Sequence, residues 1–254
     1  MLRSFATSAV LVLLFGTAGW AQTPSALSAS DGSKSVTKKP TRRNDTPAAE
    51  SGPCHIGVIP IAGNLFLVQR FGVDRVAAEG WGLDELVFSR VRAAAPGRSV
   101  RRVPFTAAEL IRGAQRPTSL FGDSLKEFAQ HVAGRISCER YVVVHRHGGR
   151  SREFGIGISK RLLFDKAILY AMMKIVVYDG RTFELIREAP ASIKDDNSFG
   201  RSLLGLPGGP VLELDPSAFP DKPADAARNP VLRDGVRALL TQSLDNTLPA
   251  LLRQ

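Results

Sequence analysis

The chain has 254 residues and a formal net charge of +10, with 34 Lys and Arg against 24 Asp and Glu. After residue 21, no stretch approaches the run of about 18 apolar residues that a membrane helix needs, which excludes a span in the remainder of the chain. The excess positive charge favours association with anionic surfaces but identifies no site.

Residues 1–21 have the pattern of a signal peptide. Arg3 supplies the positive charge, residues 9–15 (AVLVLLF) form a short apolar core, and Gly19 and Ala21 are the small residues before an expected cleavage site. A retained amino-terminal anchor is the alternative, because the pattern does not prove cleavage. The sequence therefore predicts an exported protein, periplasmic or extracellular.

Residues 22–53 are rich in Ser, Thr, Pro, Ala and Lys and have no apolar periodicity, so we expect a disordered basic tether. The remaining residues, 54–254, are enough for one sizeable core and are expected to form a single domain. Since Arg3 is the only charged residue of the signal, the chain after it carries +9.

Cys54 and Cys138 are the only cysteines, and export would place them in an oxidising compartment. Each comes just before a predicted strand, so a disulfide between the starting ends of these strands is geometrically reasonable. A loop of this length gains about 4–5 kcal/mol in the chain-entropy model. A reactive thiol pair is the alternative, but the C-x-x-C spacing is absent.

The first half of the domain alternates strands and helices. Residues 55–62 form an apolar strand, Gly63-Asn64 suits a tight turn, and residues 65–71 are expected to return as its partner. A helix follows at 83–95 and a strand at 99–105. The helix stripe comprises Leu83, Leu86, Val87, Val91 and Ala94. Two capping boxes come next, Thr106 to Glu109 and Ser124 to Glu127, and the second opens a helix that buries Leu125, Phe128, Ala129 and Val132.

Two hairpins are predicted in the second half. Residues 139–147 and 150–160 flank Gly148-Gly149, and residues 170–178 and 181–188 flank Asp179-Gly180. Both dipeptides supply the positive φ angles of two-residue turns. The elements predict an α/β (α+β) fold, with a single mixed, hairpin-rich sheet, helices packed on it and a closing carboxy-terminal helix.

The carboxy-terminal part combines a long connection with a helix. Residues 195–228 are rich in Pro and Gly and long for a connection. They also carry the apolar residues Phe199, Leu203, Leu204, Leu206, Val211, Leu212, Leu214 and Phe219. We expect this segment to pack over the sheet, and docking on a partner is the alternative. Asn229 then caps a helix that has Pro230 in its first turn and that Pro249 kinks or ends. Its expected buried stripe is Leu232, Val236, Leu239, Leu240 and Leu244.

His145 and His147 are spaced as two metal ligands on one strand would be. A turn at Gly148-Gly149 would place His147 opposite Arg150 and His145 opposite Arg152, all on one face of the hairpin. Two guanidinium groups disfavour a cation there, so the pattern argues against a metal site. The same four residues could instead be a solvated hairpin tip or could bind an anion, since arginine matches phosphate and carboxylate.

The sequence gives weaker support for a functional site at the other histidines and carboxylates. His55 and His131 fit ordinary partly buried histidines, and the adjacent carboxylates Asp195 and Asp196 point apart in a loop. Gly155, Gly157 and Ser159 leave one strand face almost bare, so something must approach it closely: most simply a packed helix, alternatively a ligand backbone. No catalytic or cofactor motif is present, and we expect no cofactor and no catalytic residue.

The order of IGVIPIAG, VVVHRHGGRSREFGIGISKR and YAMMKIVVYDGRTFELI resembles a group of exported envelope proteins. These are similar to the amino-terminal domain of the Tol-system propeller protein and to the periplasmic part of curli-secretion lipoproteins. The resemblance covers most of residues 54–190 and implies an α/β sandwich without catalytic residues. The chain departs from the lipoprotein members because it lacks the lipid-acceptor cysteine.

These features favour a non-enzymatic periplasmic or secreted module for binding or assembly that docks on anionic envelope components. Its expected partner is an envelope protein, an anionic lipid or a cell-wall surface, and export argues against nucleic acid. The alternatives are an envelope-polymer hydrolase or metal-dependent enzyme with an unrecognised site, and a secreted effector that acts outside the cell.

Overall fold

A computed structural model of the protein describes residues 52–63, 65–110, 124–147, 155–160, 166–193 and 209–253. All of them belong to one unit, residues 50–254, which is distinct from residues 1–49. The expected signal peptide and nearly all of the expected tether lie outside the described residues, and both stay predictions.

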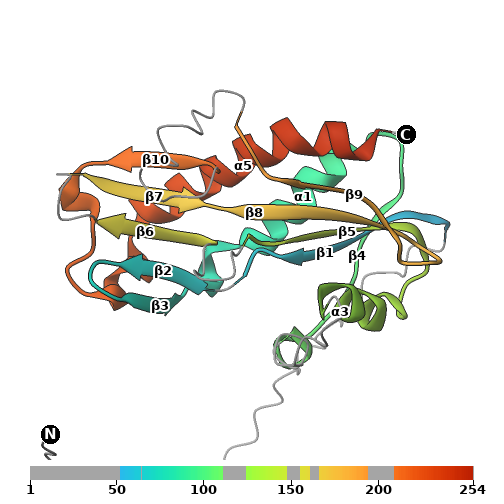
Figure 1. The fold of residues 1–254 in the computed structure, drawn as a ribbon, viewed down its shortest axis with the longest axis horizontal. Coiled ribbons are helices and arrows are strands. Elements are labelled where there is room, and N and C mark those ends of the chain that lie inside the picture. The colour runs from blue at the N-terminus through green and yellow to red at the C-terminus, as the bar shows by residue number, and fades with distance from the viewer. Residues whose placement is uncertain are drawn as a thin grey trace, which may run out of the picture. The chain divides into compact units, whose positions relative to one another are not determined.

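Two five-stranded mixed sheets form the framework (Figure 1). Sheet A has the strand order β4-β1-β5-β8-β9, and sheet B has the order β10-β7-β6-β2-β3. Sheet A contains β1 (Cys54–Ile61), β4 (Val100–Arg102), β5 (Cys138–Arg146), β8 (Met173–Asp179) and β9 (Leu185–Pro190). Sheet B contains β2 (Leu65–Gln69), β3 (Val73–Ala77), β6 (Ile156–Lys160), β7 (Ala167–Ala171) and β10 (Val211–Leu214). The α+β class is confirmed, whereas the expected single sheet is two sheets.

The two sheets are joined end to end. Only Met172 separates β7 from β8, and the two strands run in line in Figure 1. Side chains therefore keep alternating between the same two sides along both strands. Ala167, Leu169, Ala171, Met173, Ile175 and Val177 all lie in the core that contains the long helices. We call this side the helix face and the opposite side the second face.

Two helices cover the helix face, α1 (Leu83–Ala94) and α5 (Pro230–Leu252). Both follow the predicted apolar stripes: α1 buries Leu83, Val87 and Val91, and α5 buries Leu232, Val236, Leu239, Leu240 and Leu244. The Asn229 side chain accepts hydrogen bonds from the backbone N–H groups of Val231 (3.0 Å) and Leu232 (3.3 Å), as a cap should. Pro249 lies inside α5, which continues to Leu252.

A smaller core lies on the second face under α3 (Ser124–Ala133). Phe128 and Val132 of this helix pack with Tyr141, Val143 and Tyr178 of sheet A. Because sheet A is covered on both sides, its central strands are apolar on both sides, and Tyr141 to Val144 of β5 are all buried.

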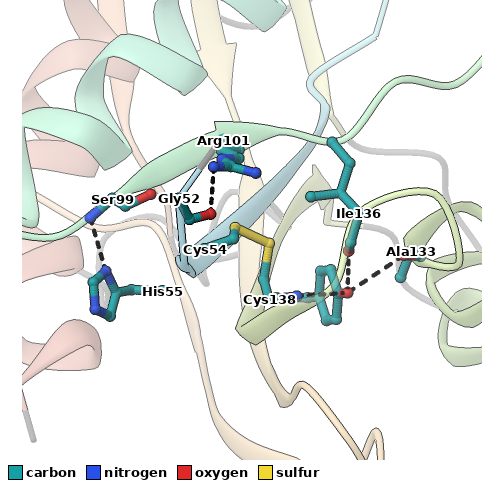
Figure 2. The surroundings of a disulfide bond; sticks show 9 residues. Gly52, Cys54, His55, Ser99, Arg101, Ala133, Ile136 and Cys138 are labelled. Carbon is teal, nitrogen blue, oxygen red and sulfur yellow. Dashed lines mark hydrogen bonds between the residues drawn. A yellow bond between two sulfur atoms is a disulfide. The ribbon is translucent and has the colours of Figure 1, made fainter. Parts of the chain in front are cut away.

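The predicted disulfide between Cys54 and Cys138 is confirmed (Figure 2). The two residues are register partners at the start of the parallel strands β1 and β5. The Tyr141 hydroxyl lies beside the bridge, where it donates to the carbonyl of Ile136 at 2.5 Å and accepts from the backbone N–H of Cys138 at 3.2 Å. The capping box at Thr106 is also formed, since its N–H donates to Glu109 Oε2 at 2.7 Å and its Oγ1 accepts from the Glu109 N–H at 3.3 Å.

Two predicted hairpins are wrong, because the chain crosses from one sheet to the other where a reversal was expected. β2 pairs with β3 and β6 and not with β1. β5 pairs with β1 and β8, and β6 pairs with β2 and β7, so the predicted alignment of residues 139–147 with 150–160 does not exist. β5 lies between β1 and β8 in sheet A, and these neighbours are chosen by contacts between residues far apart in the sequence.

The β8–β9 hairpin is confirmed, but its turn is longer than two residues. Tyr178 pairs with Leu185, and the positive φ of 55° falls on Phe183, not on Gly180. Asp179 Oδ1 accepts hydrogen bonds from the N–H groups of Arg181 and Thr182, both at 2.9 Å. Gly180 is needed for space, because a Cβ there would lie 1.9 Å from the carbonyl oxygen of Cys138.

The described part of the long connection packs against the domain, as expected. It contains β10 and two short helices, η2 (Pro216–Ala218) and η3 (Pro223–Arg228), and Phe219 belongs to the main core. Of its predicted apolar residues, Phe199, Leu203, Leu204 and Leu206 lie outside the described residues, as do Asp195 and Asp196.

Candidate functional site

The carboxyl end of β5 carries the histidines that the sequence singled out. His145 is in β5 and His147 follows the strand, where its backbone N–H donates to the Met172 carbonyl at 2.9 Å. Arg150 and Arg152 lie outside the described residues. The residue opposite His145 on β8 is Lys174, and its neighbour on β1 is Ile61.

His145 and Lys174 form a polar row across the second face of sheet A. His145 follows Tyr141 and Val143 at two-residue intervals, so it shares their side of β5. Lys174 Nζ lies 2.7 Å from Glu188 Oε2 of β9, and both side chains are partly exposed. The row therefore combines an imidazole and an ammonium group with one carboxylate at its edge.

The structure changes the argument about a metal at the histidines. The expected pairing with two arginines is wrong, but the residue opposite His145 is again a cation. In the part of the chain that the structure describes, no group of three or more His, Cys, Asp or Glu side chains is placed to hold a metal ion. The lysine opposite His145 disfavours a cation at this point, and the expected anion-binding set stays a prediction.

Arg146 holds the joint between the two sheets on the other side of β5. Its guanidinium donates to the carbonyl of Leu65 at 2.6 Å and to that of Ala62 at 3.4 Å. The side chain lies against Gly63 and Gly155, since a Cβ on either would come within 2.5 to 3.0 Å of it. These contacts fix the connection between β1 and β2, so the role of Arg146 is structural.

Asp84 holds the same link from the start of α1. Its Oδ1 accepts hydrogen bonds from the N–H groups of Ala62 (3.0 Å) and Gly63 (3.4 Å). Burial raises the pKa of Asp84 above its ordinary value, and these hydrogen bonds together with Arg102 and Arg146 oppose the rise. The carboxylate is used by the backbone and is no candidate for acid–base catalysis.

The side chain of Tyr170 covers β6 at Gly157, where the sequence predicted a packed helix. That prediction is wrong at this position. Tyr170 is the register partner of Gly157, and its hydroxyl would lie 2.4 Å from a Cβ on that glycine. The hydroxyl is buried and has no hydrogen-bond partner among the described residues, and burial raises its pKa. Sequence reasoning missed Tyr170, because its position over Gly157 depends on strand pairing.

His55 and His131 have structural surroundings. His55 Nδ1 accepts a hydrogen bond from the N–H of Ser99 at 3.0 Å, as Figure 2 shows. His55 is the second residue of β1, whereas the neighbour of His145 on that strand, Ile61, is its last. His131 Nε2 lies 3.7 Å from Glu109 Oε1, which also pairs with Arg135. The structure does not bring these histidines to the end of β5.

Comparison with known proteins gives no family. No known family model matches the sequence, and no curated protein matches it. Solved structures that match the chain include protein XCC0632 from Xanthomonas campestris, of family DUF330, with 11% identity over 81% of this chain and 87% of that chain and a TM-score of 0.39. The hypothetical protein CT253 from Chlamydia trachomatis has 12% identity over 79% and 96% and a TM-score of 0.36. Lipoprotein GNA1162 from Neisseria meningitidis has 18% identity over 60% and 91% and a TM-score of 0.28.

At these TM-scores the likenesses establish neither a family nor an activity. The neighbours include a lipoprotein, but the finer resemblance to the Tol-system and curli-secretion proteins stays a prediction. Within the described ranges, no helix has both the length and the apolarity to cross a membrane.

Proposed function

We propose that the protein is an exported, non-enzymatic binding module that docks on anionic components of the cell envelope. The observation that carries this proposal is the basic character of the carboxyl end of β5. His145 lies beside Lys174 there, His147 follows, and Arg150 and Arg152 come within the next five residues of the sequence. Four of these five residues are the anion-binding set expected from the sequence.

Two further observations support export and docking. The Cys54–Cys138 disulfide fits an oxidising compartment outside the cytosol. The chain after the predicted signal carries a charge of +9, which attracts anionic lipid or polymer at moderate ionic strength. No described residue favours the alternative of an envelope-polymer hydrolase or metal-dependent enzyme.

The test is co-sedimentation of the protein with phospholipid vesicles. The protein is purified after export, its first residue is determined by mass spectrometry, and vesicles of neutral lipid are compared with vesicles containing phosphatidylglycerol. We expect binding to the anionic vesicles only, weakened by added salt and stronger at pH 5.5 than at pH 7.5, because imidazoles gain charge in this interval. Equal binding to both vesicles, or to neither, would refute the proposal.

Histidine variants locate the site. The double variant His145→Asn with His147→Asn should lose the gain in affinity at pH 5.5, which we expect to be about fivefold for each added charge near an anionic surface. His131→Asn is the matched control, because His131 lies on α3 and is exposed. An unchanged pH dependence in the double variant would remove the histidines from the site.

A further inference from the structure

Arginine side chains surround the last turn of α5. Arg98 Nη1 donates to the carbonyl of Leu252 at 3.1 Å, and Arg187 Nη1 donates to the carbonyls of Ala250 (2.9 Å) and Arg253 (3.1 Å). The last carbonyls of a helix lack partners within the helix and carry partial negative charge, so cations gather there. These bonds bring Arg98 and Arg187, from two different parts of the chain, to one helix end.

Arg140 lies on the same side of sheet A. It precedes Val142 and Val144 at two-residue intervals, and both belong to the core under the helices. Arg187 is the register partner of Val177, which belongs to the same core. We call Arg98, Arg140, Arg187 and Arg253 the arginine cluster.

The arginine cluster is not neutralised by carboxylates. Some arginines outside the cluster do pair with carboxylates: Arg90 with Asp245 at 3.3 Å, and Arg102 with Glu85 at 2.9 Å. Within the described part of the chain, no member of the cluster has a carboxylate oxygen within 4.0 Å. Asp179 is the register partner of Arg140, but its carboxylate accepts hydrogen bonds from its own turn.

The cluster has hydrogen-bonding capacity left and is spread over a surface. A guanidinium has five N–H donors, and Arg98 and Arg187 each use a single nitrogen on the carbonyls of α5. Arg140 and Arg187 are two strands apart, which is about 10 Å in a sheet. Donors that come from two strands and a helix end can each meet a different headgroup of an anionic surface, and the competition experiment below separates this from binding of a single free anion.

The cluster lies at the end of the domain where the chain enters. Arg101 Nη2 donates to the carbonyl of Gly52 at 2.6 Å beside the start of β1 (Figure 2). The predicted tether joins the domain here, and its basic residues are Lys34, Lys38, Lys39, Arg42 and Arg43. The arginine cluster therefore lies at the end of the domain where residue 52 leads into β1.

We propose that the arginine cluster is the face that this protein lays on an anionic phospholipid bilayer, with headgroup phosphates between the guanidiniums. This rests on the proposed function and adds the surface that makes the contact. The cluster is on the helix face, at the opposite end of β5 from His145. It is therefore a second contact, independent of the histidines.

The test is vesicle co-sedimentation at pH 7.5, where imidazoles are mostly neutral. The double variant Arg140→Gln with Arg253→Gln leaves the bonds between Arg98, Arg187 and α5 in place. We expect its affinity for phosphatidylglycerol vesicles to fall about fivefold for each arginine. The matched control is Lys222→Gln with Arg228→Gln, which removes the same charge beside η3 and should change affinity less than twofold.

The outcomes separate this inference from the proposed function. If the unaltered protein does not bind anionic vesicles, the proposed function fails and the inference with it. If it binds but both double variants weaken binding equally, or neither does, only the arginine cluster is refuted. Competition by inorganic phosphate beyond that of sodium chloride at equal ionic strength would indicate a site for the free ion and overturn the bilayer assignment. Binding to purified cell wall alone, with the same dependence on Arg140 and Arg253, would overturn it as well.

Discussion

At the end of the domain where the chain enters, a covalent bond joins β1 to β5, whereas the β2–β3 hairpin at the far end of sheet B has an open edge. The entry end also has the three-way hydrogen bonding of the Tyr141 hydroxyl and the ring of Phe183 stacked on Tyr141 at 5.2 Å. The hairpin end exposes Phe71 (81%) and Val73 (55%). Next to its turn, Arg70 lies over the Phe219 ring at 5.0 Å.

The two regions should differ in the free energy that local opening requires. Strands paired at both edges and tied by a disulfide open only with the whole domain, while an exposed edge strand opens at lower free energy. The charged side chains Asp74 and Arg75 on β3 discourage pairing of this edge with other chains. Substitutions at the entry end should therefore cost more than similar ones at the hairpin end.

The largest expected effect is loss of the disulfide. Cys54→Ser with Cys138→Ser should lower the free energy of unfolding by about 4–5 kcal/mol, because a long loop in the unfolded chain is no longer closed. Urea unfolding with and without reductant measures this. The control is Phe71→Ser at the hairpin end, which should stay within about 0.5 kcal/mol of the original protein. Comparable losses in the two variants would contradict the contrast.

Glycine substitutions test the same contrast at single positions. Gly180→Ala should destabilise by about 1–3 kcal/mol or more, because its Cβ would overlap the Cys138 carbonyl. Gly72→Ala in the hairpin turn has nothing within 4 Å of the new Cβ and no positive φ, so a change within about 0.5 kcal/mol is expected. Thermal unfolding of both variants decides, and a larger loss at Gly72 would show that the hairpin end is the more constrained.

The joint between the sheets should respond to Asp84. Asp84→Ala leaves the N–H groups of Ala62 and Gly63 without their acceptor, at a cost of about 1–3 kcal/mol, whereas Asp84→Asn keeps an acceptor oxygen. Because burial raises the folded-state pKa of Asp84, protonation favours the folded state, and its stability relative to Asp84→Asn should rise as pH falls through that pKa. Urea unfolding of both proteins from pH 7 to 3 tests this. A fall in stability relative to Asp84→Asn as the pH is lowered would contradict the prediction.

Glu109 should give the smallest effect, with the opposite sign. Hydrogen bonds from Thr106, then Arg135, lower the pKa of Glu109 to about 2. Its contribution to stability is therefore complete above the unfolded value of about 4.3 and is lost as pH falls toward 2. Glu109→Gln should remove this loss without weakening the hairpin end, as urea midpoints between pH 5 and 2 would report. An unchanged pH dependence would mean that the Thr106–Arg135 contacts do not form in solution.

Elements with local signals could be predicted from the sequence. The stripes of α1 and α5, the Asn229 cap and the Thr106 capping box depend on residues within a few positions of each other, and all are present. β3 was missed, because Val73–Ala77 is short and has charged residues at its centre. The arginine cluster was missed too, since its members are far apart in the sequence and meet only at the end of α5.

The sequence by itself determined the α+β class, the helices, most strands and the single possible disulfide, because periodicity, caps and a count of two cysteines are local or arithmetic facts. Only the tertiary structure decided which strands pair. Gly63-Asn64 and Gly148-Gly149 are compatible with a reversal or a crossover, and the choice depends on hydrogen bonds between distant residues. For the same reason the sequence placed His145 on a strand, while Lys174 and Glu188 became its neighbours through the pairing of β5, β8 and β9.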